Sequence, residues 1–147
     1  NFSYYPSQFF FFLTMFEPTI KKIVLFIFIK YLAFYIFMMF KNGNYALIKL
    51  NELRTLQDVF YYMWIFLFLP TLVSILFTAP IYYAFKTNQP ALFVLIIGLF
   101  FVAEYYIYTN LASQIDLNNG LYNAFLGLLF LIILFFNPIS RIMKIKL

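Results

Sequence analysis

Two charged residues lie inside strongly apolar stretches of the sequence, and they are the clearest candidates for chemistry. Glu104 lies within GLFFVAEYYIY, and Lys30 lies within IVLFIFIKYLAFYIFMMF. An acidic residue at the centre of a membrane helix costs roughly 2.5–3.5 kcal/mol, so such residues usually face protein or water and mark ion paths. We therefore predict Glu104 and Lys30 as proton-path candidates, and a buried ion pair between them would be one arrangement.

Each of these residues also has a purely structural interpretation. Tyr105, Tyr106 and Tyr108 follow Glu104, and tyrosines favour the depth of the lipid headgroups, so Glu104 could lie at the end of its helix and reach the interface. A lone lysine can extend its aliphatic stem toward the membrane surface and keep its ammonium group in water. The sequence leaves both alternatives open.

Other kinds of site are excluded by the residue types that are missing. The chain has no Cys and no His, which removes thiolate nucleophiles, the usual zinc and haem ligands and the usual general base at neutral pH. We predict no catalytic residues, no cofactor-binding residues and no metal site. At most, the chain would be a subunit of a proton-translocating oxidoreductase.

The elements that position these residues are predicted to be membrane helices. Of 147 residues, 65% are hydrophobic and only 10% are charged, well outside the range of soluble domains. We predict an all-α integral membrane protein with one membrane domain over residues 1–147. About four transmembrane helices are expected over residues 23–40, 59–85, 91–109 and 121–136, and an amphipathic interfacial helix over residues 44–58.

Prolines and basic residues refine this prediction. Pro70 should kink the second helix, and Thr71 and Ser74 are near enough to bond the backbone carbonyl that it frees. Asn137 and Pro138 should end the fourth helix. More Lys and Arg residues flank the termini and the 86–90 loop than the other side, which predicts that both termini face the cytoplasm or the mitochondrial matrix. We interpret the net charge of +5 as a feature of this membrane topology and as a source of attraction to anionic lipid. No nucleic-acid partner is therefore expected.

The string NQPALFVLIIGLFFVAE resembles the last membrane helix of the 4L-type small subunit of respiratory complex I. The matching residues are Gln89, the run Ala91–Val94, and Ala103–Glu104, over about 20 residues. In that family the glutamate belongs to a chain of buried polar groups involved in proton translocation, so the resemblance implies this role for Glu104. The family differs in having three helices and a second membrane glutamate in the preceding helix.

The sequence thus predicts a small membrane subunit of a multisubunit respiratory complex, mainly structural, with a role for Glu104 in proton translocation. Its partners would be membrane lipid and other membrane subunits. The abundance of residue types with AT-rich codons, such as Phe (23) and Tyr (13) against Gly (4), suits an organelle genome and the mitochondrial inner membrane. The alternative is a stand-alone transporter or channel in the inner membrane of an AT-rich bacterium, acting as a homo-oligomer.

Overall fold

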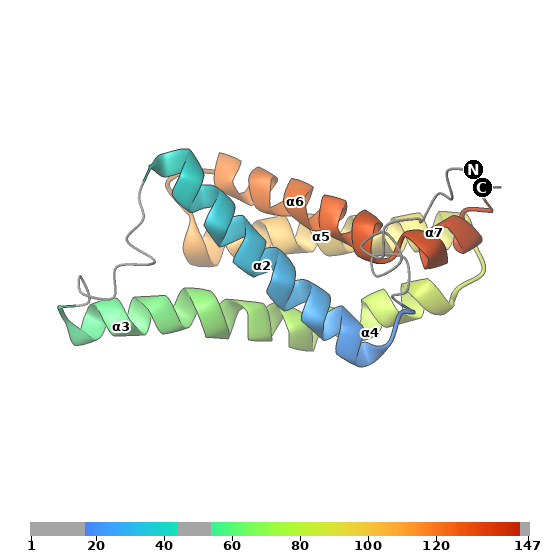
Figure 1. Ribbon diagram of the computed structural model, residues 1–147, viewed down its shortest axis with the longest axis horizontal. Coiled ribbons are helices and arrows are strands. Elements are labelled where there is room, and N and C mark those ends of the chain that lie inside the picture. The colour runs from blue at the N-terminus through green and yellow to red at the C-terminus, as the bar shows by residue number, and fades with distance from the viewer. Residues whose placement is uncertain (1–16, 44–53, 145–147) are drawn as a thin grey trace, which may run out of the picture.

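The protein is a bundle of helices (Figure 1), described by a computed structural model for residues 17–43 and 54–144. These residues contain no strand, so the all-helical prediction is confirmed for them. The elements are α2 (Ile20–Asn42), α3 (Leu56–Met63), the π-helical turn η2 (Trp64–Phe68), α4 (Leu69–Lys86), α5 (Pro90–Ala112), α6 (Asn118–Leu134) and α7 (Phe136–Ile142).

Three of these helical stretches are long and apolar enough to cross a membrane. They are α2, the continuous 31-residue stretch from Leu56 to Lys86, and α5. A fourth candidate exists only if α6 and α7 are taken together, because the chain bends by 85° between them. The structure therefore gives three to four candidate spans where the sequence predicted about four.

The bend between α6 and α7 explains why the fourth predicted helix differs from its predicted range of 121–136. A proline ring clashes with the carbonyl group four residues earlier, which for Pro138 belongs to Leu134. The helix accordingly ends at Leu134, and a new helix begins at Phe136. Pro138 then lies in the first turn of α7, where its missing N–H is not needed.

The long helices form a four-membered ring in cross-section. α2 packs against α4 and α6, and α5 also packs against α4 and α6, so α2 and α5 occupy opposite corners of the bundle. At one end, α2 and α5 begin and α4 and α6 end; we call it the basic end (Figure 1). The opposite end, where α2 and α5 end and α3 and α6 begin, is called the far end.

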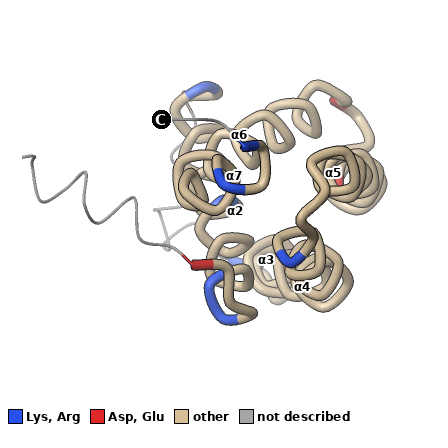
Figure 2. The backbone as a smooth tube through the Cα atoms, turned by 90° about the vertical axis from the view of Figure 1, so that its right-hand side faces the viewer, with Lys and Arg blue, Asp and Glu red and all other residues tan. Residues whose placement is uncertain are grey.

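Charge is distributed unevenly between the two ends. Figure 2 views the molecule from the basic end. The basic residues at this end, within the described part of the chain, are Lys21, Lys22, Lys86, Arg141 and Lys144. Glu17 offsets one of them through an exposed ion pair with Arg141 at 2.6 Å. Among the described residues of the far end, the basic Lys41 and Arg54 are balanced by Asp58 and Asp116.

The surface of the bundle is as apolar as its core, unlike that of a water-soluble bundle. Large apolar side chains cover the outer faces of the helices, for example Leu32, Ile75, Leu95 and Phe125. Lys30 and Glu104, in contrast, are completely buried. An apolar surface of this extent marks contact with lipid or with other proteins.

A π-helical turn precedes Pro70, and it leaves the Ile65 carbonyl without a backbone partner in its own helix. In η2 the N–H of Leu69 donates to the carbonyl of Trp64 instead of that of Ile65. The next donor in the π pattern would be residue 70, which is proline and has no N–H. The Tyr35 hydroxyl donates to the Ile65 carbonyl over 2.9 Å. The structure thus gives this bond to Tyr35, and Ser74 Oγ, which the sequence placed near enough to form one, has no partner among the described residues.

Removing the Tyr35 hydroxyl has a predictable effect. Tyr35→Phe should lower the free energy of unfolding by about 0.5–1.5 kcal/mol, because it removes a hydrogen bond to a part-buried carbonyl. In a Pro70→Ala background the effect should be smaller, because the helix can then return to α-helical bonding and pair Ile65 internally. Tyr83→Phe, at an exposed tyrosine, is the control. Equal losses in the two backgrounds would contradict this explanation, and denaturant titration of the purified protein measures them.

The predicted interfacial helix over residues 44–58 falls mostly on residues 44–53, which lie outside the described residues. Its last three residues belong to α3, which begins at Leu56. Thr55 and Asp58 form a capping box there: the Asp58 carboxylate accepts from the Thr55 N–H, and the Thr55 hydroxyl oxygen accepts from the Asp58 N–H. The second long helix therefore has its own defined start at this point.

Candidate functional site

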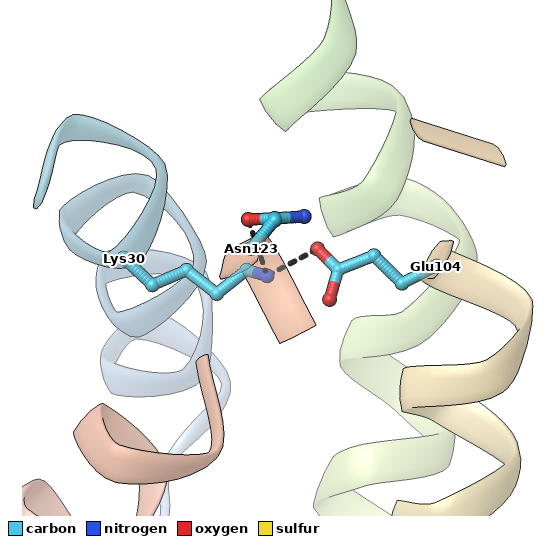
Figure 3. A network of polar contacts seen from close by, with 3 residues as sticks. All are labelled: Lys30, Glu104 and Asn123. Atoms are coloured by element: carbon cyan, nitrogen blue, oxygen red, sulfur yellow. Dashed lines mark hydrogen bonds and ion pairs between the residues drawn. The ribbon is translucent and has the colours of Figure 1, made fainter. Parts of the chain in front are cut away.

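The two sequence-predicted site residues meet at the centre of the bundle (Figure 3). The Lys30 ammonium group forms an ion pair with the Glu104 carboxylate and donates a hydrogen bond to Asn123 Oδ1 over 3.3 Å. Both charged side chains are 0% exposed. Of the alternatives that the sequence left open, the structure therefore has the buried ion pair, and neither the interfacial Glu104 nor the snorkelling Lys30.

The three residues come from three different helices. Lys30 lies near the middle of α2, Glu104 in the second half of α5, and Asn123 in the first half of α6. Because α2 and α5 occupy opposite corners, the ion pair crosses the bundle diagonally. The pair thus ties together two helices that the ring arrangement otherwise connects through α4 and α6.

A glycine on α6 makes the room that this crossing needs. A Cβ atom at Gly127 would lie 2.9 Å from Phe101 Cε1 and 3.1 Å from Lys30 Nζ, both too close for ordinary contact. Gly127 lies one turn after Asn123, so both face the same side of the helix. This face of α6 therefore provides a hydrogen-bond acceptor for Lys30 and the space for its side chain.

The remaining surroundings of the pair are aromatic and incompletely bonded. Lys30 Nζ lies 4.7 Å from the centre of the Tyr31 ring and 6.0 Å from that of Phe100. The Tyr31 hydroxyl lies beside the Glu104 carboxylate and Asn123, and neither it nor a Glu104 oxygen makes a hydrogen bond of regular geometry there. Buried polar groups are usually hydrogen-bonded, so these atoms have unused capacity for water or protons.

Two aromatic layers enclose the pair along the bundle axis. Toward the far end, Phe34 and Tyr108 pack edge to face with ring centres 5.2 Å apart. Toward the basic end, Phe26 and Phe135 pack edge to face at 6.0 Å. Phe26 lies four residues before Lys30 on α2 and Phe34 lies four residues after it. The two layers are therefore at similar distances from the ion pair, on opposite sides of it.

This arrangement can hold or move a proton. A proton passed from the lysine ammonium to the carboxylate converts the ion pair into a neutral pair, without any change in total charge. No group of three His, Cys, Asp or Glu side chains that could hold a metal ion occurs within residues 17–43 and 54–144.

Sequence reasoning found both charged residues but missed their neighbours Tyr31, Asn123 and Gly127. A signal for α6 was present, because Gly120, Asn123 and Gly127 follow at spacings of three and four residues and thus share one helix face.

Comparison of the chain with protein-family models, with curated proteins and with solved structures gave no match. The resemblance to the complex I subunit therefore stays a prediction.

Proposed function

We propose that this chain is an integral membrane protein whose Lys30–Glu104 pair takes part in proton translocation. In this proposal it is a small membrane subunit of a multisubunit respiratory complex, and its membrane is the mitochondrial inner membrane. The observation that carries the proposal is the fully buried ion pair across the bundle, within helices whose outer faces are apolar.

The energetics of burial argue that this pair has a role beyond holding helices together. Two buried charges lose several kcal/mol of hydration each, and well-packed apolar residues often stabilise a protein equally well or better. An apolar pair would also suit a bundle that is otherwise rich in Phe, Leu and Ile. Ionisable residues retained inside a membrane domain are by default assigned to ion or proton paths, with their partner.

The apolar outer surface supports a place within a larger assembly. Bulky Phe, Leu and Ile side chains protrude from all the long helices. Such a surface is suited to contact with lipid and with neighbouring membrane subunits. The local resemblance around Glu104 and the AT-rich coding pattern favour a respiratory assembly in an organelle.

The assembly part of the proposal is tested by native gel electrophoresis after extraction in a mild detergent. The chain has a mass of 17.6 kDa, and we expect it to migrate together with many other chains in a much larger species. A small multimer containing this chain alone would contradict the subunit assignment and favour the stand-alone transporter or channel.

The proton part is tested in sealed membrane vesicles that contain the protein in its natural assembly. Glu104→Gln should reduce proton translocation at least tenfold, because the amide cannot take up a proton in place of the carboxylate. The double variant Lys30→Met/Glu104→Met should be equally inactive although its core is uncharged. Glu17→Gln/Arg141→Gln, which neutralises the exposed pair, is the matched control and should behave as wild type. Normal translocation by the double variant would show that the buried pair is structural.

A further inference from the structure

A cavity of about 450 Å³ opens into the bundle at the far end. Its lining, from α2, α3, η2, α5, α6 and the segment after α5, mixes apolar side chains such as Met38, Met39 and Ile65 with polar ones. The polar members include Asn42, Asp58, Tyr61, Ser113 and Asn119. A cavity needs only about 10–15 Å³ of accessible volume and a few polar partners to hold a water molecule. This cavity is large and polar enough to admit several.

The inner end of the cavity lies close to the buried ion pair. Phe34 and Tyr108 line the cavity and contact each other edge to face, with their ring planes at 88°. Phe34 is four residues from Lys30, and Tyr108 is four residues from Glu104. Each ring therefore lies one helical turn, about 6 Å along the axis, from the charged residue on the same face of its own helix.

The basic end has no comparable approach among the described residues. A pocket of about 540 Å³ exists there, lined by residues 17–19, by residues near the ends of α4 and α7 and by the adjacent loop. Its buried lining residue Phe85 packs against Phe135 with ring centres 5.0 Å apart, and Phe135 packs in turn against Phe26, so one more aromatic ring separates this pocket from the ion pair. Glu104 lies fourteen residues into α5 from that end, about 21 Å along the axis. The buried side chains Phe26, Phe93 and Phe135 occupy the bundle between them.

We infer that the far-end cavity is the aqueous entrance to the Lys30–Glu104 site, and that the Phe34–Tyr108 contact is the barrier between them. This inference rests on the proposed role of the pair in proton translocation and adds the side from which protons arrive. Water in the cavity reaches the two rings. A rotation of either ring then connects that water with the polar groups around Glu104, which include the Tyr31 hydroxyl.

The natural absence of cysteine allows a direct test with single cysteines and an anionic thiol reagent, (2-sulfonatoethyl) methanethiosulfonate, on the membrane-embedded protein. Ala112→Cys lines the cavity and should react, whereas Val102→Cys, on the outer face of α5, should not. Asn88→Cys, at the basic end, should react only from the opposite side of the membrane. An unreactive Ala112→Cys would overturn the inference.

The barrier is tested with a reporter beyond it. Asn123 contacts Lys30, so a cysteine at this position reports on access to the ion pair. In the otherwise unchanged protein, Asn123→Cys should react slowly with the thiol reagent. Phe34→Ala should raise its rate at least tenfold, and Phe34→Leu should raise it less. Phe26→Ala is the matched control, because it removes the same ring at the same distance from Lys30 on the other side, and it should leave the rate unchanged. Equal acceleration by Phe34→Ala and Phe26→Ala, or none by either, would overturn the barrier.

The labelling experiments and the proposed function fail in different ways. Thiol labelling requires no proton transport, so the expected pattern of rates together with normal translocation by Glu104→Gln would refute the proton role and leave the cavity as a water-filled entrance. Loss of translocation in Glu104→Gln together with an unreactive Ala112→Cys would keep the proton role and refute this entrance.

Discussion

Lys30→Met should lower the free energy of unfolding by about 3–5 kcal/mol, whereas Lys30→Met/Glu104→Met should be close to wild type or more stable. The single substitution leaves Glu104 buried without its counterion, while the double substitution replaces both buried charges by flexible apolar side chains of similar length. Titration of the detergent-solubilised protein with a denaturing detergent measures both variants, with the fluorescence of the single tryptophan, Trp64, as the signal.

The exposed pair at the basic end provides the control for this result. Arg141→Ala should change the free energy of unfolding by no more than about 1 kcal/mol, because an exposed ion pair is screened by water and gains little. Its partner Glu17 is also largely exposed, so no charge is left buried. A Lys30→Met variant no less stable than Arg141→Ala would contradict the burial of the central pair.

Gly127→Val should be strongly destabilising, at the upper end of the roughly 1–3 kcal/mol typical of overpacking. The new side chain would occupy the space of the Lys30 stem and the Phe101 ring, and it would push the ammonium group away from Glu104. The variant should therefore also reduce proton translocation. The same denaturation and vesicle experiments measure the two effects.

Gly98→Val is the matched control for this substitution. Gly98 also lies in a long helix, but a Cβ atom there meets nothing within 4 Å, so valine should change stability by less than about 0.5 kcal/mol. Similar losses at Gly98 and Gly127 would show that glycine matters for helix conformation generally. A loss confined to Gly127 would show that the contact with Lys30 is decisive.

Much of the fold could be predicted from apolar run lengths alone. The runs 23–40, 59–85 and 91–109 each lie within a helical stretch of the structure, extended by a few residues at the ends. Which side of each helix faces inward could not be predicted, because the outer faces are as apolar as the inner ones. On α2 the buried face includes Phe26, Lys30 and Phe34. Only the charge of Lys30 distinguished this face from the others in the sequence.

Features that depend on contacts between helices were beyond sequence reasoning. A kink was predicted at Pro70, and the structure has a π-helical turn just before it, but Tyr35, the partner of the Ile65 carbonyl, lies on another helix. The sequence placed Lys30 and Glu104 inside apolar runs and could suggest that they pair. It could not show that their helices occupy opposite corners, or that Asn123 and Gly127 complete the site.

For the proposed membrane location, the shortness of α6 has a consequence for the surrounding lipid. Its 17 residues span about 25 Å, whereas the 23 residues of α2 span about 34 Å and a typical hydrocarbon core is about 30 Å thick. In a bilayer, such a mismatch is accommodated by local thinning of the membrane beside α6, by flanking side chains that reach to the interface, or by a neighbouring protein. In the proposed bilayer, we therefore expect the flank at the sharp turn into α7 to be the place where the lipid is most deformed and where a neighbouring subunit would be most stabilising.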